Sequence, residues 1–160
     1  MSTPQDGLAN VIADVSFNIS GAGVLTIPSN ADGRSARFQV GPAAALPAVA
    51  GVAGVGIVRT ATGVVDVAID AGKGAGPNTV AASLQCEFSV AYNGQDPTLP
   101  MSHTVAEKTG ATASTPNLRI FTFHFFSHTL APGPGGSVVV LADPAQCTIT
   151  VRRKKELYPQ

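Results

Sequence analysis

The stretch of sequence that decides the fold is GVGIVRTATGVVDVAID, residues 54–70. Its second half alternates in parity, and the large aliphatic side chains share one parity: Val65, Val67 and Ile69. The acidic side chains share the other parity: Asp66 and Asp70. Because successive side chains leave opposite faces of a strand, this alternation predicts a half-buried β-strand whose aspartate side is polar. Together with its valine-rich first half, the stretch predicts a β-hairpin.

The connection of this hairpin is predicted to be a tight loop of three residues that ends at Gly63. Such loops need a residue with positive φ at that position, which glycine adopts at little cost. The resulting register pairs Val55 with Ile69 and Ile57 with Val67 on the buried face. A slip of one residue would place Ile57 opposite an aspartate, so burial favours the stated register.

The whole chain is poor in charge. Among its 160 residues ten are basic and ten are acidic, which gives a formal net charge of zero and a charged fraction of 12%. Soluble domains usually carry about 25% charged residues. A globule with so few charges has little to keep its copies apart, so the composition favours a surface that partners cover. The balance of charges argues against a general nucleic-acid-binding protein, which would carry a basic excess.

Glycine and proline interrupt the chain throughout, at 17 and 12 residues. Short strands separated by such turns are typical of a single all-β domain built as an antiparallel β-sandwich, jelly roll or barrel. Besides the hairpin, strands are expected over these stretches: residues 10–20, 24–27, 37–40, 80–92, 103–108, 118–127, 138–141 and 145–151. The domain is expected to cover residues 10–153, after a flexible leader (1–9) and before a short basic tail (154–160).

Neither a signal peptide nor a membrane span is expected. The N-terminal residues lack the basic region and the apolar core of a signal peptide. Residues 40–58 carry no charge, but Pro42, Pro47 and several glycines interrupt them, and most of their apolar residues are alanine or valine. This composition argues against a transmembrane helix.

Two cysteines, Cys86 and Cys147, lie far apart in the sequence and each falls on the apolar parity of its predicted strand. They are expected to be buried small hydrophobic residues. A disulfide between neighbouring strands is the alternative, which a reducing compartment disfavours. Their spacing and that of the histidines matches no metal site, so we expect neither metal nor cofactor.

The strand predicted over residues 118–127 is apolar on both faces. Phenylalanines occupy one parity: Phe121, Phe123 and Phe125. Other large apolar residues occupy the second parity: Leu118, Ile120 and Phe126. Only one face of a strand in an antiparallel sandwich usually meets the core. The second face therefore needs a cover, which is either a neighbouring subunit or loops of the same chain.

No catalytic site is expected. His124 and His128 share the second parity of this strand and are interpreted as structural residues, with an interface or pH-sensitive contact as the alternative. Serine, histidine and aspartate are all present, but no nucleophile-elbow motif brings them together. A cupin-like metalloenzyme would need clustered ligands, and only His103 adds to the two histidines above.

Two segments resemble small virion proteins of tailed bacteriophages. Residues 58–67, VRTATGVVDV, are similar to the RT-x-T-G-V-Y-x-V hairpin of these proteins. Residues 142–144, ADP, and the closing strand TITVRR, residues 148–153, are similar to their C-terminal ends. The family includes capsid decoration (cement) proteins and the tips of head or tail fibres. Several members are trimers of jelly rolls similar to the globular heads of complement and tumour-necrosis-factor-like proteins.

The resemblance implies a homotrimeric structural protein of the virion, made in the host cytoplasm, that binds the major capsid protein from outside and stabilises the shell. The alternative within the family is a receptor- or glycan-binding fibre tip, with the loops 72–77 and 95–101 as candidate sites. The candidate contact residues for the oligomer or the capsid are these: Ile120, His124, Phe126, Arg152, Arg153, Lys154 and Lys155. The four basic residues would suit an acidic partner surface, or they protect a strand end from edge pairing.

Overall fold

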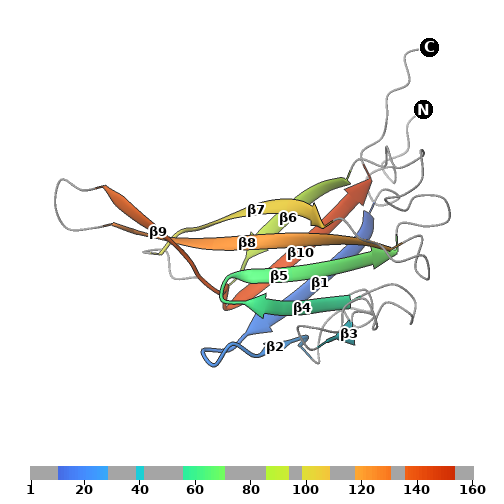
Figure 1. Cartoon of the computed structure of the whole chain (residues 1–160), viewed down its shortest axis with the longest axis horizontal. Helices are drawn as coiled ribbons and strands as arrows, with labels where there is room; N and C mark the ends of the chain where they lie inside the picture. The colour runs from blue at the N-terminus through green and yellow to red at the C-terminus, as the bar shows by residue number, and fades with distance from the viewer. Residues whose placement is uncertain are drawn as a thin grey trace, which may run out of the picture.

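The structure, a computed structural model, describes these parts of the chain: residues 11–28, 39–41, 56–70, 86–93, 99–108, 118–130 and 136–153. Within them the chain forms strands β1 to β10 and no helix (Figure 1). The predicted all-β class is therefore confirmed. In these same parts, no helix with the length and hydropathy of a membrane span occurs.

The first sheet has four antiparallel strands in the order β2-β1-β10-β6. Its strands are β1 (Val11–Ile19), β2 (Leu25–Thr26), β6 (Cys86–Tyr92) and β10 (Gln146–Arg153). Strand β1 turns directly into β2, as the sequence predicts for the glycine-containing segment between them, and Gly23 there has a φ of 78°. The chain's described beginning and end thus pair in the middle of this sheet.

The second sheet has six strands, ordered β3-β4-β5-β8-β7, with β9 also paired to β8. Its strands are β3 (Gln39–Val40), β4 (Gly56–Ala61), β5 (Val64–Asp70), β7 (Met101–Lys108), β8 (Leu118–Leu130) and β9 (Ser137–Leu141). Strand β3 runs parallel to β4, and every other pair is antiparallel. Strand β8 is the longest and organises the sheet.

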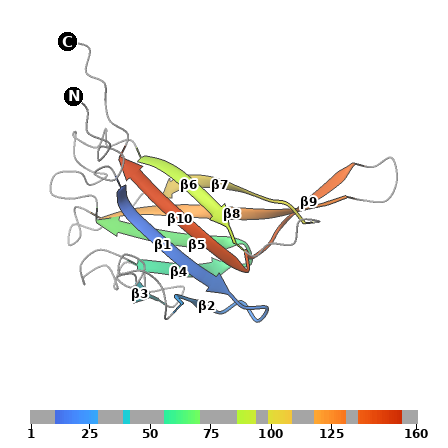
Figure 2. The ribbon, with the colours of Figure 1, turned by 180° about the vertical axis from the view of Figure 1, so that it is seen from behind.

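The two sheets pack face to face, with β6, β10 and β1 behind β7, β8 and β5 in Figure 1 and in front of them in Figure 2. Apolar side chains of one parity from each sheet form the shared core: Val15, Phe17, Ile19, Leu25, Ile57, Val65, Val67, Ile69, Phe121, Phe123, Phe125, Cys147, Ile149 and Val151. Phe88 joins it edge-on, with ring centroids 4.7 Å from Phe121 and 5.5 Å from Phe123. Burying each such side chain stabilises the fold by about 1.5–3 kcal/mol.

The hairpin formed by β4 and β5 has the predicted register. Ile57 pairs with Val67, and Gly63 has a φ of 69°. The strands continue to Ala61 and Val64, which pair across a bulge next to the turn. The predicted pair of Val55 with Ile69 lies outside the described residues.

The side of this hairpin that carries Asp66 is largely buried, which corrects the prediction of a polar face. Asp66 is only 3% exposed. Its carboxylate accepts hydrogen bonds from Thr122 Oγ1 at 2.6 Å and from Lys108 Nζ at 3.0 Å. On the same face Val58 and Ala68 are buried in a second small cluster with Ile120. A buried carboxylate is tolerated here because a cation and a hydroxyl compensate it, and the alternation of hydropathy alone does not reveal that.

The two cysteines are not joined. Strands β6 and β10 are neighbours, but Cys147 pairs with Tyr92 whereas Cys86 pairs with Arg153. The two sulfurs therefore belong to positions six residues apart along the ladder (147 to 153), a distance of about 20 Å. A disulfide needs Cα atoms within about 7 Å. The thiols are unlinked, and Cys147 is buried as predicted, whereas Cys86 is only partly buried against the core.

The other predicted strands occur with shifted bounds. The strand expected over residues 118–127 continues to Leu130, and the one expected over 103–108 begins at Met101. The strand expected over 80–92 is described from Cys86 onward. Several predictions lie outside the described residues: the leader 1–9, the tail 154–160, the loop 72–77 and most of the segments 40–58 and 95–101.

Candidate functional site

The histidines do not converge on one another. His103 on β7 lies opposite Phe125, so it belongs to the inner face of its sheet. His124 and His128 have the parity of Phe126 and belong to the outer face. In the described parts of the chain, no three side chains of histidine, cysteine, aspartate or glutamate gather where they could hold a metal ion.

His103 links the two sheets instead. Its Nδ1 lies 2.9 Å from the hydroxyl of Tyr92 on β6, the edge strand of the opposite sheet. Burial raises the pKa of Tyr92 and lowers the pKa of His103. Both shifts favour a protonated phenol that donates to a neutral imidazole. This contact closes the edge of the sandwich between β6 and β7.

A serine and a histidine do meet on the outer face. Ser102 Oγ lies 2.7 Å from His128 Nε2, between neighbouring strands β7 and β8. A catalytic dyad of this kind needs a third group that orients the histidine and donors that stabilise an oxyanion. No carboxylate of the described residues hydrogen-bonds His128. The contact is therefore best understood as a cross-strand hydrogen bond.

Among the described residues, Arg59 and Asp143 form the side-chain contact that gathers the most hydrogen bonds. Arg59 Nε donates to Asp143 Oδ1 at 3.0 Å and its Nη2 donates to Oδ2 at 2.8 Å. The backbone N–H of Gly63 donates to the same Oδ1 at 2.8 Å, and Arg59 Nη2 also donates to Thr62 Oγ1 at 3.0 Å. The hydrogen bond to Asp143 raises the pKa of Arg59 against the opposing effect of burial. We call these four residues the Arg59 node.

The Arg59 node sits where three connections of the chain meet. The turn between β4 and β5 supplies Gly63, and the link between β9 and β10 supplies Asp143. The turn between β1 and β2 lies beside the node, since an added Cβ at Gly23 would lie 2.7 Å from the Arg59 guanidinium. The node thus joins residues 58–67 to residues 142–144.

Gly63 also lies where one edge of β8 changes its neighbouring strand from β5 to β9. Phe125 N donates to Gly63 O at 2.7 Å, and Ala142 N donates to Phe125 O at 3.1 Å. At Phe125, the pairing of β8 with the start of β5 therefore stops and its pairing with the end of β9 takes over. A Cβ at Gly63 would lie 2.8 Å from both Ala142 N and Phe125 O. Glycine is required here by space as well as by φ.

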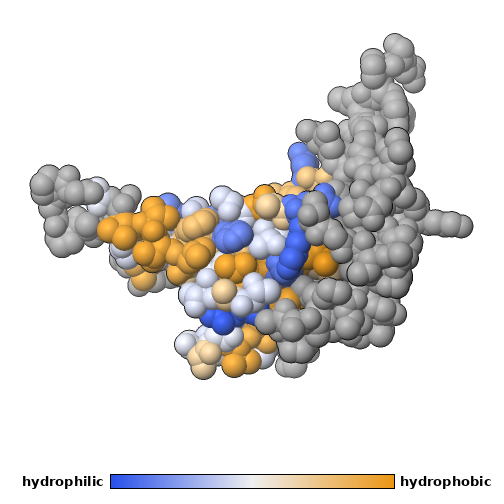
Figure 3. All heavy atoms as spheres, viewed as in Figure 1, coloured by the Kyte–Doolittle hydropathy of each residue, from blue (hydrophilic) through white to orange (hydrophobic). Residues whose placement is uncertain are grey.

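Beyond Phe125, β8 and β9 form a two-stranded arm. We define the arm as residues 127–130 of β8 together with β9. It projects past both sheets in Figures 1 and 2, and hydrophobic residues gather over it in Figure 3. Four consecutive side chains of β9 are 43–49% exposed: Val138, Val139, Val140 and Leu141. Such an apolar surface usually marks a site of interaction.

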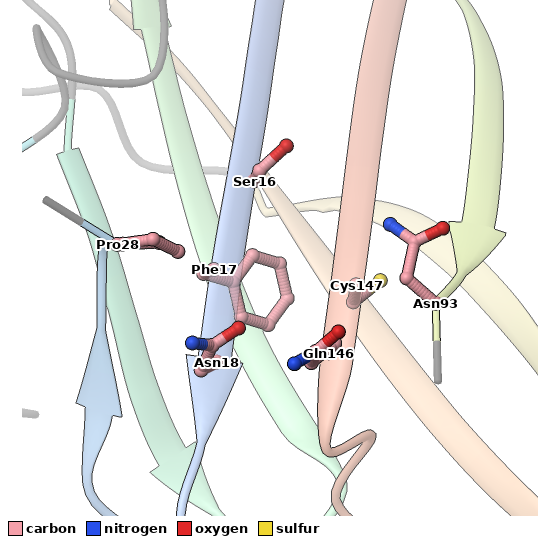
Figure 4. A pocket seen from close by; sticks show the side chains of 7 residues that line it. All are labelled: Ser16, Phe17, Asn18, Pro28, Asn93, Gln146 and Cys147. Carbon is pink, nitrogen blue, oxygen red and sulfur yellow. The ribbon is translucent and has the colours of Figure 1, made fainter. Parts of the chain in front are cut away.

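Two depressions lie near the base of the arm and the adjoining ends of the strands. The one in Figure 4 has a volume of about 240 Å³ and is lined by Ser16, Phe17, Asn18, Pro28, Asn93, Gln146 and Cys147. The second has a volume of about 380 Å³, and its apolar lining includes Leu99, Met101 and Pro144. The first is smaller than the range of about 300–1,000 Å³ typical of small-molecule sites. Its amide side chains are its main polar feature.

The predicted contact residues fall on opposite faces of the sandwich. Ile120, His124 and Phe126 are half-buried on the outer face of β8, and Ile120 packs against Val58 and Ala68 of its own sheet. Arg152 is exposed on the outer face of the other sheet, since its neighbour Val151 is buried in the core. Lys154, Lys155 and the side chain of Arg153 lie outside the described residues.

Of the residues in the arm, the sequence singled out only His128. The β9 segment of the arm, SVVVL, was expected as an ordinary strand. The signal that distinguishes it is the run of four aliphatic residues without alternation, which a strand covered on one face does not need.

Comparison with known proteins finds no matching family model, no matching curated protein and no matching solved structure.

Proposed function

We propose that this chain is a capsid decoration protein of a tailed bacteriophage, a homotrimer of jelly rolls that binds the outside of the capsid and stabilises it. The observation that carries the proposal is the Arg59 node. The two segments that resemble phage virion proteins lie about 80 residues apart in the sequence, yet Arg59 and Asp143 join them through a two-pronged ion pair. The two segments that resemble phage virion proteins are therefore in direct contact in the fold.

The surface chemistry supports a binding role. The chain carries a formal net charge of zero, and four neighbouring aliphatic residues of the arm are exposed. The polar contacts of the described residues, such as Tyr92 with His103 and Asp66 with Lys108, hold strands together. A protein of this kind would act through binding free energy. A ligand that binds only the assembled shell stabilises it by mass action, by about 2.7 kcal/mol at a concentration 100 times its Kd.

The two groups of contact residues suggest a division of roles. The outer face of β8, with Ile120, His124 and Phe126, would form the contact between subunits, because it is apolar and half-buried. Arg152, on the opposite side of the sandwich, would meet an acidic surface of the major capsid protein together with the basic residues that follow it in the sequence. Complementary charge at such a rim mainly raises the association rate and the salt dependence of binding.

The experiment mixes the purified chain with undecorated capsids of the phage that encodes it. We expect dozens to hundreds of copies to bind each particle and the thermal midpoint of the capsid to rise. The variant Arg152→Glu should bind more slowly, with a weaker salt dependence, and Glu87→Gln on the neighbouring strand is its control. If the chain did not bind capsids, and if purified virions contained only a few copies of it, the decoration role would be rejected.

A fibre tip is the second candidate, and the depression in Figure 4 is the observation that favours it. Asn18, Asn93 and Gln146 bring three amide groups to its lining, and amides are suited to hydrogen-bond sugar hydroxyls. Binding to a glycan array that is lost in Asn18→Ala would support this function. An array without binding would leave the decoration role as the proposal.

A further inference from the structure

The backbone of β9 presents an open hydrogen-bonding edge. Ala142 N donates to Phe125 O, which sets the phase of the ladder between β9 and β8. His128 N donates to Pro100 O on the opposite edge of β8, at 2.9 Å. Since His128 pairs with Val139, the N–H and C=O groups of Val139 point away from β8. By the same alternation, those of Leu141 also point to the outer edge.

No strand in the described parts of the chain pairs with this outer edge. Exposed strand edges are usually protected by charged residues, proline, a bulge or short length. The outer strand β7 carries Glu107 and Lys108, and the outer strand β6 carries Glu87. Strand β9, SVVVL, carries no charge and no proline. It is an edge whose chemistry favours the addition of another strand.

We infer that β9 pairs in an antiparallel manner with β9 of a second copy of this chain, about a two-fold axis at Val139. In that register Val139 lies opposite its own counterpart, and Val138 lies opposite Val140 of the other copy. The two valines at the centre exchange both backbone hydrogen bonds, because their polar groups point outward. Pairs of β-branched residues across strands are among the favourable ones. The second sheets of the two copies become one continuous sheet.

Charge complementarity selects a second copy as the partner. The edge is uncharged, so a nucleic acid or an anionic membrane would find no cation on β9 with which to pair. The same strand of another copy is uncharged throughout and places valine opposite valine at the three central positions. A zero formal net charge means that two copies do not repel each other at long range. A two-fold contact also closes on itself, so each β9 edge is used once.

The inference does not depend on the proposed function, since Val139 at its centre belongs neither to the Arg59 node nor to the proposed contact residues of β8. The arm would join two protomers, or two oligomers, whatever they bind. Taken with the proposed homotrimer, it predicts that trimers associate in pairs, so that the particle in solution contains an even number of chains of 16.2 kDa. An isolated trimer would overturn this inference and leave the proposed function.

The test measures the mass of the full chain by light scattering and sedimentation over a concentration series. Val139→Lys places a charge at the two-fold axis, and Val139→Pro removes the outward N–H without removing a bond to β8. Both should halve the mass of the parent and leave its circular dichroism and thermal midpoint in the dilute limit unchanged. The control Val24→Lys changes another exposed valine, on the turn between β1 and β2, and should keep the mass of the parent.

A second readout follows the edge itself. Amide hydrogen exchange of Val139 and Leu141 should be slowed in the associated parent and fast in Val139→Lys, while the amide of Val140, which faces β8, stays protected in both. A monomeric or odd-numbered parent would overturn the inference. So would a Val139→Lys variant that is folded and keeps the mass of the parent.

Discussion

Arg59 and Asp143 are 84 residues apart in the chain and form a two-pronged ion pair, with nitrogen–oxygen distances of 3.0 and 2.8 Å. Their side chains are 22% and 19% exposed, so solvent screens the pair only in part. The same carboxylate accepts the N–H of Gly63, which ties the turn of the β4–β5 hairpin to the link between β9 and β10. The contact orients three connections at the base of the arm.

Replacement of Asp143 should therefore lower stability by more than an ordinary surface substitution. Asp143→Ala removes the ion pair and leaves the N–H of Gly63 without its acceptor, and we expect a loss of about 1–3 kcal/mol in the free energy of unfolding. Asp143→Asn keeps an acceptor oxygen for Gly63 and should lose less. Urea denaturation of Asp143→Ala, of Arg59→Ala and of the variant that carries both changes completes a double-mutant cycle, and Asp143→Asn is measured beside them. Additive effects of Arg59→Ala and Asp143→Ala would show that the pair contributes nothing.

Gly63 should be more sensitive to substitution than another glycine with the same backbone conformation. Gly63→Ala combines a positive φ with a Cβ 2.8 Å from two backbone atoms. We expect it to lose at least about 2 kcal/mol. Gly136 has a φ of 79° with nothing within 4 Å of an added Cβ, so Gly136→Ala should lose only about 1 kcal/mol. Equal losses in thermal or urea unfolding would contradict the close approach at Gly63.

His103 should make the fold less stable in mild acid. Burial lowers its pKa below the ordinary value of 6.5, so the unfolded chain takes up a proton at a higher pH than the folded one. The contribution is complete above about pH 6.5 and is lost as the pH falls through the folded-state pKa. His103→Gln should flatten the slope of stability between pH 7.5 and 5. Tyr92→Phe removes the hydrogen bond but keeps the burial, so it should retain that slope. A parent slope that His103→Gln leaves unchanged would count against this assignment.

Cys147 should resist thiol reagents in the folded chain. It is 1% exposed, and burial raises its pKa to about 12, so almost no thiolate is present at neutral pH. In the variant Cys86→Ser, iodoacetamide should label Cys147 only after denaturation, as mass spectrometry would measure. Labelling of the folded variant at the rate of the denatured one would mean that the core around β10 opens readily.

The amino-acid sequence by itself determined the all-β class, the β4–β5 register and the buried parity of most strands. Those features are local. Alternation with period two appears within a strand of six to nine residues, and the pairing of Ile57 with Val67 follows from the turn that ends at Gly63. The shared buried face of Phe121, Phe123 and Phe125 could be predicted because they also alternate within a single strand.

Only the tertiary structure decided which residues meet across the fold. The contact of Arg59 with Asp143 depends on β5 and β9 sharing one edge of β8, and no local pattern encodes that neighbourhood. The burial of Asp66 depends on Thr122 and Lys108 from two other strands. The side chains of β9 are exposed because β8 continues to Leu130, past the residues that pair with β5 and β7. Side-chain periodicity specifies a face of a strand, whereas the cover over that face comes from strands far away in the sequence.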